Sequence, residues 1–304
     1  MKIDIGSFKG FLDRFSTVVG VDGNKNYKYL SDDNDYRWRP ILKYNEKYFV
    51  QNTTRICWIL KDELENDLRE NDVIWEKYQK HKSSYLEKET LDLLKKILPE
   101  SQVYQSLYYK IGGQRCELDG LVVYDSNILV IEAKSGLYNR VAKRGGIKSL
   151  KTTIYNNIEF AFQQANRARD YIFDCDNIIF ENAKGEEIVN IKRDLYQNIF
   201  LVNVTLEYFA ELSVDLYKLK ELNIYKSSEF PWTVTLNDLA VIADFIKFPS
   251  QFIHYVLFRN KFNNTMSNDN NLKMVYELDL LGIYLTEEDE HKKITLLKIL
   301  IKIL

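Results

Sequence analysis

Two neighbouring apolar segments that carry charged residues constrain this chain more than any other feature. Residues 116–136 read CELDGLVVYDSNILVIEAKSG, with two runs of alternating side chains on either side of the polar stretch DSN. Side chains alternate between the two faces of a strand, so this pattern predicts a β-hairpin. One face of the first strand would carry Glu117, Asp119, Leu121 and Val123, and one face of the second would carry Ile128, Val130, Glu132 and Lys134. Two acids and a lysine are therefore expected on adjoining, otherwise apolar strands.

Asp119, Glu132 and Lys134 together suit a bound divalent metal ion. A charge in apolar surroundings is costly unless it has a partner. Magnesium prefers oxygen ligands and is typically bound by one or two carboxylates, with waters and substrate phosphate oxygens completing the shell. The two carboxylates and the backbone carbonyl of Ala133 would supply ligands for Mg²⁺ or Mn²⁺. Lys134 would orient or help to deprotonate the attacking water and would offset charge on the phosphate. The pattern therefore indicates metal-dependent hydrolysis of a phosphodiester bond.

The same residues resemble the D…(D/E)xK core of the PD-(D/E)xK, or restriction-endonuclease-like, nuclease superfamily. Twelve residues separate Asp119 from the triplet Glu132-Ala133-Lys134, and the segments ELDGLVVYD and ILVIEAKSG are most similar to the nuclease-related (NERD-like) branch. Leu118 stands where the name-giving pattern has proline. The resemblance implies a central mixed β-sheet flanked by helices, and the rest of the sequence predicts N- and C-terminal α/β extensions around this core. It also implies a Mg²⁺-dependent nuclease that favours DNA, acting in defence against phage or foreign DNA.

Two helices beside this hairpin offer further candidate residues. Residues 83–99 predict a helix that ends at a proline, and Glu87 falls within its apolar face. Residues 158–172 predict a second helix, in which Gln164 shares a stripe of alanines and needs a hydrogen-bond partner. Related nucleases use an acid and a glutamine at such places, so the resemblance makes Glu87 a metal-binding and catalytic candidate and Gln164 a catalytic one. The alternatives are a boundary salt bridge for Glu87 and a bond to a backbone carbonyl for Gln164.

A basic, glycine-containing segment connects the hairpin to the second helix. Lysine and arginine neutralise phosphates, and glycines allow close backbone approach. We expect this segment to bind the nucleic-acid backbone, although a solvated charged loop is the alternative. Its candidate cations are Arg140, Lys143, Arg144, Lys148 and Lys151.

Composition excludes several other classes of function. The formal net charge is −2, so any contact with nucleic acid must come from a local patch. Three widely spaced cysteines provide neither a disulfide framework nor a zinc site, and none of the three histidines has metal-ligand or triad spacing. The apolar C-terminal run is too short to span a membrane. We therefore expect a cytoplasmic protein that does not enter membranes.

The chain is expected to comprise three parts. Residues 1–80 predict an N-terminal α/β extension with a hairpin around Asn45-Glu46 and a helix at 58–68. Residues 81–210 predict the nuclease-like core, which closes with a strand at 198–204. Residues 211–304 predict a mainly helical extension with a strand at 232–236, helices at 238–248 and 251–259, and an asparagine-rich loop at 263–271.

Three functional hypotheses follow from these features. The first is the nuclease, for which paired strand breaks would require a homodimer and a companion defence protein would be a partner. The second is a non-catalytic nucleic-acid-binding subunit of a defence or repair complex. The third is a scaffold protein in which Asp119 and Glu132 face solvent far apart, and a structure tests this geometry directly.

Overall fold

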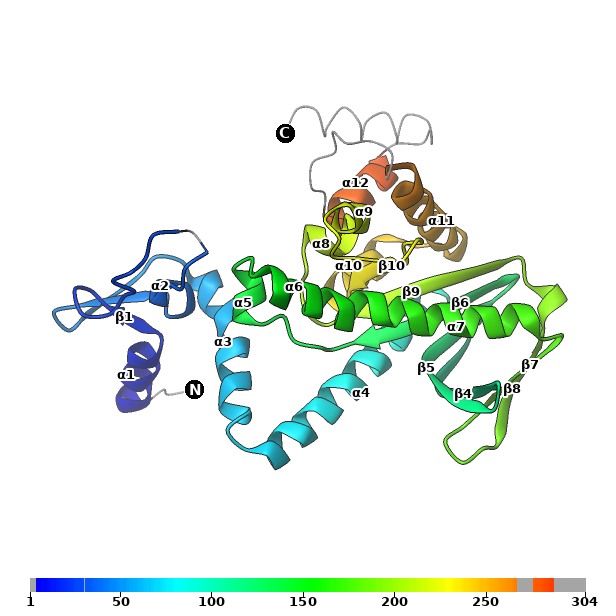
Figure 1. Ribbon diagram of the computed structural model, residues 1–304, viewed down its shortest axis with the longest axis horizontal. Coiled ribbons are helices and arrows are strands. Elements are labelled where there is room, and N and C mark those ends of the chain that lie inside the picture. The colour runs from blue at the N-terminus through cyan, green and yellow to red at the C-terminus, as the bar shows by residue number, and fades with distance from the viewer. Residues whose placement is uncertain (1–3, 30, 267–275, 287–304) are drawn as a thin grey trace. The chain divides into compact units, whose positions relative to one another are not determined.

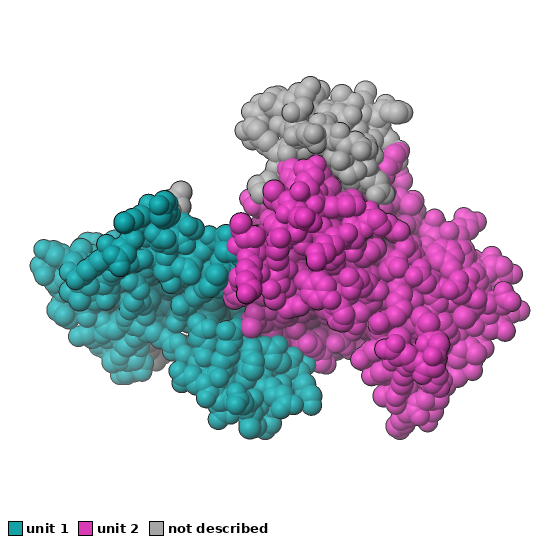
Figure 2. Space-filling model, viewed as in Figure 1, with its two compact units in different colours: residues 1–80, 140–146 teal, residues 81–139, 147–304 magenta. Residues whose placement is uncertain are grey.

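The computed structural model describes residues 4–29, 31–266 and 276–286, and the chain forms two compact units (Figure 2). The first unit comprises residues 1–80 and 140–146, and the second comprises residues 81–139 and 147–304. The segment 140–146 thus belongs with the N-terminal residues, although it follows the hairpin in sequence. Residues after 210 belong to the same unit as the hairpin, because a strand from that region joins the main sheet.

The first unit contains a three-stranded sheet and several helices. β1 runs parallel to β2, and β2 pairs with β3 in an antiparallel hairpin around Asn45-Glu46, as expected from the sequence. The expected helix at 58–68 is also confirmed, although it begins earlier. The elements are α1 (Ile5–Arg14), β1 (Ser16–Val18), α2 (Asp35–Trp38), β2 (Ile41–Tyr44), β3 (Lys47–Val50), α3 (Thr53–Leu68) and α5 (Arg140–Lys143).

Both residues of the β2–β3 turn have positive φ, 45° at Asn45 and 56° at Glu46. A side chain other than that of glycine or asparagine is disfavoured in this conformation. Glu46→Gly is therefore expected to raise the free energy of unfolding of this unit by about 0.5–1 kcal/mol. Urea unfolding would measure it, with Glu46→Gln as the control that removes the charge and keeps the strain. A Glu46→Gly protein less stable than the Gln variant would contradict this reasoning.

The second unit is built on a seven-stranded mixed sheet of order β10-β9-β6-β5-β4-β7-β8 (Figure 1). β10, β9 and β6 are parallel, and the remaining neighbours are antiparallel. The expected class, a mixed sheet flanked by helices, is thus confirmed. The strands are β4 (Gln102–Ile111), β5 (Gln114–Tyr124), β6 (Asn127–Lys134), β7 (Asn177–Glu181), β8 (Glu187–Lys192), β9 (Asn198–Thr205) and β10 (Trp232–Thr235).

Helices cover both faces of this sheet. α7 lies along one face and contacts β5, β6 and β9 (Figure 1). Its alanines and Phe162 pack there against Leu121, Ile128 and Val130. The other face packs against α4 and the C-terminal helices through a cluster that includes Leu94, Ile131 and Val202. We call these the α7 face and the α4 face. The helices are α4 (Asp72–Ile97), α6 (Ile147–Ile154), α7 (Phe160–Asp174), α8 (Glu211–Val214), α9 (Leu216–Glu221), α10 (Leu236–Phe245), α11 (Pro249–Met266) and α12 (Glu277–Thr286).

The structure refines several expected elements of this unit. The helix expected at 83–99 starts eleven residues earlier, at Asp72. The helix expected to begin at residue 158 is preceded by α6 and by a π-helical turn, Tyr155–Glu159. The helix expected at 238–248 begins at Leu236 and is capped by the Thr235 side chain, which accepts from Asp238 N. Of the expected loop at 263–271, residues 263–266 are helical and the rest lie outside the described residues.

Asp215 lies at the junction of α8 and α9 and is buried, which raises its pKa to about 6. A carboxyl group whose pKa is higher in the folded state stabilises the fold below its unfolded pKa, and this contribution is lost as the pH rises through 6. Relative to the wild type, Asp215→Asn is expected to gain about 2–3 kcal/mol of stability between pH 4 and pH 7. Denaturant unfolding of both proteins across this range would measure the difference. A difference that does not vary with pH would contradict the assignment.

Candidate active site

Asp119 lies where β5 loses its regular pairing with both neighbours. The β4–β5 ladder pairs Gln105 with Gly120 and Leu107 with Leu118, and skips the position between them. The skipped residue of β4, Ser106, has a positive φ of 52°. On the other side, the β5–β6 ladder ends at Gly120 and Ile131. The Asp119 backbone is therefore released from both ladders, while the β4–β5 register stays the same on either side of this position.

This irregularity changes the alternation expected for the first strand. Leu118 and Leu121 both pack on the α7 face, whereas strict alternation would place them on opposite faces. A Cβ added to Gly120 would meet Leu91 of α4, so Gly120 lies toward the other face. The second strand does alternate as expected, with Ile128 and Val130 on the α7 face. The interruption of both ladders at Asp119 is the physical reason for the difference.

The three charged residues of the hairpin converge. Lys134 Nζ donates to Glu132 Oε2 at 2.6 Å and to Asp119 Oδ2 at 3.1 Å. The backbone N–H of Ala133 also donates to Asp119 Oδ2, at 2.8 Å. The arrangement in which Asp119 and Glu132 face solvent far apart is thereby excluded. One ammonium group holds both carboxylates together.

Burial governs the electrostatics of this group. The Glu132 side chain is fully buried, while Lys134 and Asp119 are each 17% exposed. Burial, and next the charge of Asp119, raise the pKa of Glu132 well above its usual value, although Lys134 opposes them. Burial lowers the pKa of Lys134, but the charges of Glu132 and Asp119 outweigh it, so that pKa lies above its usual value. The group thus contains a desolvated acid beside a lysine that holds its proton.

The donor set at this place fits a hard divalent cation. Glu132 Oε1 is buried and has no hydrogen-bond partner among the described residues. The N–H and C=O of one strand residue point to the same edge, so the Ala133 carbonyl faces the Asp119 side along with its N–H. No group of three or more His, Cys, Asp or Glu side chains within the described ranges is placed to hold a metal ion. Two carboxylates and one carbonyl are within what Mg²⁺ requires from a protein.

Glu87 lies on α4 in the electrostatic neighbourhood of this group. Its carboxylate accepts from Gln105 Nε2 at 3.2 Å. Burial raises the pKa of Glu87, the Gln105 bond lowers it, and the negative charge of Asp119 raises it further. Its hydrogen-bond partner is therefore an amide of β4, next to the position where the β4–β5 ladder is interrupted.

α7 contributes Gln164 and Arg167. Gln164 is half-buried, and its Oε1 lacks a hydrogen-bond partner within the described part of the chain. The expected bond from its side chain therefore does not involve this oxygen. The neighbouring Tyr109 hydroxyl, and more weakly the Glu132 charge, raise the pKa of the Arg167 guanidinium. Arg167 also lines a cavity of about 420 Å³ together with Lys110 and Gln163. The lining also includes Asp170 and Asp174, so the charges of this cavity offset each other.

The basic connection divides between the two units. Arg140 pairs with Glu63, and its guanidinium carbon lies 4.6 Å from the centre of the Trp38 ring. Lys143 lies 2.7 Å from Asp62, and Arg144 lies 3.2 Å from Asp33. These three cations are therefore engaged with acids of the first unit. The other two candidates, Lys148 and Lys151, are exposed on α6 of the second unit.

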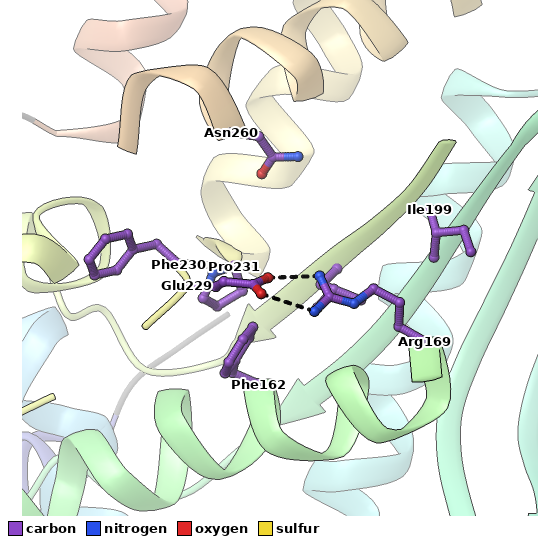
Figure 3. A pocket seen from close by; sticks show the side chains of 8 residues that line it. Phe162, Arg169, Ile199, Glu229, Phe230, Pro231 and Asn260 are labelled. Atoms are coloured by element: carbon purple, nitrogen blue, oxygen red, sulfur yellow. Dashed lines mark hydrogen bonds and ion pairs between the residues drawn. The ribbon is translucent and has the colours of Figure 1, made fainter. Parts of the chain in front are cut away.

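A second cavity, of about 260 Å³, lies between α7, β9 and α11 (Figure 3). Figure 3 shows Arg169 and Glu229 facing each other in it, and their closest atoms are 2.8 Å apart. Phe162 and Phe230 contribute apolar walls. Because the two charges offset each other, this cavity lacks the net positive charge that favours a phosphate.

Sequence reasoning missed two polar residues at this place, Ser106 and Asn203. Ser106 carries the positive φ beside Asp119, and nothing in its local sequence predicts this conformation. Asn203 is the in-register neighbour of Glu132 on β9 and is 1% exposed. A polar residue inside the apolar run NIFLVNVT was the signal that could have identified it.

Comparisons of the chain with protein-family models, with curated proteins and with solved structures find no match. Over the described residues, no helix is long and apolar enough to cross a membrane.

Proposed function

We propose that this protein is a metal-dependent nuclease that hydrolyses phosphodiester bonds of nucleic acid. The observation that supports it most is the convergence of Asp119, Glu132 and Lys134 beside a buried, unpaired carboxylate oxygen. DNA is favoured as the substrate, and defence against foreign DNA as the context, by the resemblance of these residues to the restriction-endonuclease-like superfamily.

The residues have distinct roles in this proposal. Asp119, Glu132 and the Ala133 carbonyl would hold Mg²⁺ or Mn²⁺, which supplies Lewis-acid activation of water and phosphate. Lys134 has a raised pKa, so it acts as a cationic hydrogen-bond donor to a phosphate oxygen rather than as a base. Arg167 lies within the electrostatic range of Glu132 and would offset part of the charge of an approaching backbone.

Incubation of the purified protein with plasmid, linear and single-stranded DNA and with RNA tests this function. We expect cleavage of at least one substrate with Mg²⁺ or Mn²⁺, and none with a chelator. Asp119→Ala is expected to abolish both metal binding and cleavage while the protein remains folded, and Lys134→Ala to lose turnover with little change in substrate affinity. Calorimetry with Mn²⁺ measures the binding.

Glu117→Gln is the matched control. Glu117 is an exposed acid two residues from Asp119 on the same strand, and its carboxylate accepts from the Tyr108 hydroxyl. Its substitution is expected to leave cleavage unchanged. A wild-type protein that cuts none of the substrates, or Asp119→Ala protein that cuts as well as wild type, would reject the nuclease.

The alternative is a non-catalytic nucleic-acid-binding or scaffold subunit built on the same sheet. The observation that favours it is the ion pairing of Lys134 with both acids, which would then serve stability alone. Binding of DNA or RNA without cleavage, and without dependence on a divalent metal, would support this alternative.

A further inference from the structure

Asn203 is a buried amide at the centre of the sheet, directly beside Glu132. The two residues are in-register neighbours on the parallel strands β6 and β9. Phe200, Val202 and Val204 of β9 pack on the α4 face, so the alternation of the strand places Asn203 on the α7 face. An unsatisfied buried amide costs about 1–3 kcal/mol. Asparagine is therefore an unfavourable choice for this position unless its side chain is used.

The Asn203 side chain binds the π-helical turn Tyr155–Glu159. Its Nδ2 donates to the backbone carbonyl of Asn157 at 2.9 Å. A carbonyl can only accept, so this bond fixes the orientation of the amide and turns its oxygen elsewhere. That oxygen, like Glu132 Oε1 on the next strand, has no hydrogen-bond partner among the residues described. Two unpaired acceptors thus lie on adjacent strands.

The turn is also held from the end of β6. Asn157 Nδ2 donates to Thr153 O at 3.0 Å, which fixes the Asn157 side chain against its own helix. Gly136, two residues after Lys134, faces this side chain. A Cβ at Gly136 would lie only 2.6 Å from Asn157 Oδ1. The absence of a side chain at Gly136 therefore allows the turn to pack closely against the chain that leaves the active site.

The π-helical turn separates two packing environments along one continuous helix. Ile154 and Ile158 pack in a cluster with Phe209 and Leu216, whereas Ala161 and the following stripe of α7 pack against the sheet. One extra residue in a turn rotates the helix after it by about 100°. The turn therefore sets which side chains of α7 face the sheet, among them those near Glu132.

We propose that Asn203 is a positioning residue of the Glu132 site. This role rests on the nuclease function proposed above. The Asn203 amide donates to the π-helical turn, and this turn fixes the rotation of α7 and with it the positions of Gln164 and Arg167. The Asn203 oxygen is buried on the same face of the sheet as the unpaired oxygen of Glu132, on the adjacent strand. Asn203 thereby holds the carboxylate and its neighbours in the arrangement that binds the metal, without touching the substrate.

Asn203→Leu tests this role, because it keeps the branched shape of the side chain and removes the amide. Outer partners of metal ligands typically change metal affinity or activity by about 10–100-fold. We therefore expect the Mn²⁺ concentration for half-maximal cleavage, and the calorimetric Kd for Mn²⁺, to rise by about 10–100-fold. The KM for DNA should stay near the wild-type value, a separation that a general loss of folded protein would not produce.

Thr233→Val is the matched control. Thr233 is the next in-register residue of the same row, on β10, and is fully buried with an Oγ1 that lacks a partner in the described chain. The Thr233→Val substitution is expected to leave the metal dependence of cleavage unchanged. Gly136→Ala is the second variant, since it displaces Asn157 from the opposite side and should raise the Mn²⁺ requirement in the same direction. Thermal unfolding gives the folded fraction of each protein.

The outcomes separate the two proposals. Wild-type metal dependence in Asn203→Leu, or in Gly136→Ala if the first variant does not fold, would overturn the positioning role alone. An equal rise of the Mn²⁺ requirement in Thr233→Val would also overturn it, because the loss of any buried polar group from this row would then have the same effect. A wild-type protein that neither binds Mn²⁺ nor cleaves nucleic acid would overturn the nuclease function, and the role of Asn203 with it.

Discussion

Replacement of Arg259 by methionine is expected to lower the free energy of unfolding of the second unit by about 3–5 kcal/mol. Arg259 and Glu277 are both buried, with exposures of 0% and 3%. Arg259 Nε donates to the two carboxylate oxygens at 2.9 and 3.0 Å. Trp232 Nε1 and the Tyr255 hydroxyl donate to Glu277 Oε1 at 2.9 and 2.6 Å. Without the guanidinium, the carboxylate would remain buried with these two neutral donors in place of a charged partner.

Denaturant unfolding measures this loss, and an exposed pair provides the control. Lys96 and Asp244 lie 2.6 Å apart in the same unit, with exposures of 56% and 68%. Lys96→Met is expected to change stability by less than about 1 kcal/mol, because exposed pairs contribute little. The double variant Arg259→Met/Glu277→Leu should recover much of the loss, since no charge is left unpaired. Equal effects of Arg259→Met and Lys96→Met would contradict the assignment.

Glu132→Gln is expected to change activity and stability in opposite directions. Loss of a metal-binding carboxylate should lower cleavage by at least about 10²-fold. The metal-free protein, however, should be as stable as the wild type or more stable, because the variant no longer buries a charge. Lys134 keeps Asp119 as a partner at 3.1 Å. This combination distinguishes an active site from a structural ion pair.

The stability difference should also depend on pH. The pKa of Glu132 is raised in the folded state, chiefly by burial. Its carboxyl group therefore stabilises the fold at low pH, and this contribution is lost as the pH rises through the folded pKa. Glu132→Gln should gain stability relative to the wild type between pH 5 and pH 8, measured by thermal unfolding without metal. A Glu132→Gln protein that is less stable than the wild type at both pH values and still cleaves nucleic acid would show that Glu132 has a structural role.

Much of the candidate site follows from local sequence patterns. Alternation placed Glu132 on a strand with Ile128 and Val130, and the structure has them there, with the short turn before Asn127. The Asn45-Glu46 hairpin and the strand at 198–204 are equally local features. The strands β4, β7 and β8 were not predicted from the sequence. Among the described residues, β4 and β7 share one paired position, and the β4–β5 ladder is interrupted at Ser106.

The residues around the site were harder to predict because their roles depend on distant partners. The positive φ of Ser106 occurs at the interruption of the β4–β5 ladder, opposite Asp119. Asn203 binds a carbonyl 46 positions away in sequence. Arg140, Lys143 and Arg144 read as free cations beside the site, yet each is paired with an acid far earlier in the chain. Charge counts along a sequence do not reveal such pairings.

The sequence by itself determined which charged residues lie on the two strands of the hairpin: the pattern of residues 116–136 was enough to place Asp119, Glu132 and Lys134 on adjoining strands. Only the tertiary structure decided how they meet, because the interruption of the β4–β5 ladder at Ser106, the burial of Glu132 and the anchoring of the π-helical turn by Asn203 arise from contacts between distant segments. Strand periodicity is a property of neighbouring residues, whereas desolvation and register are properties of the folded sheet.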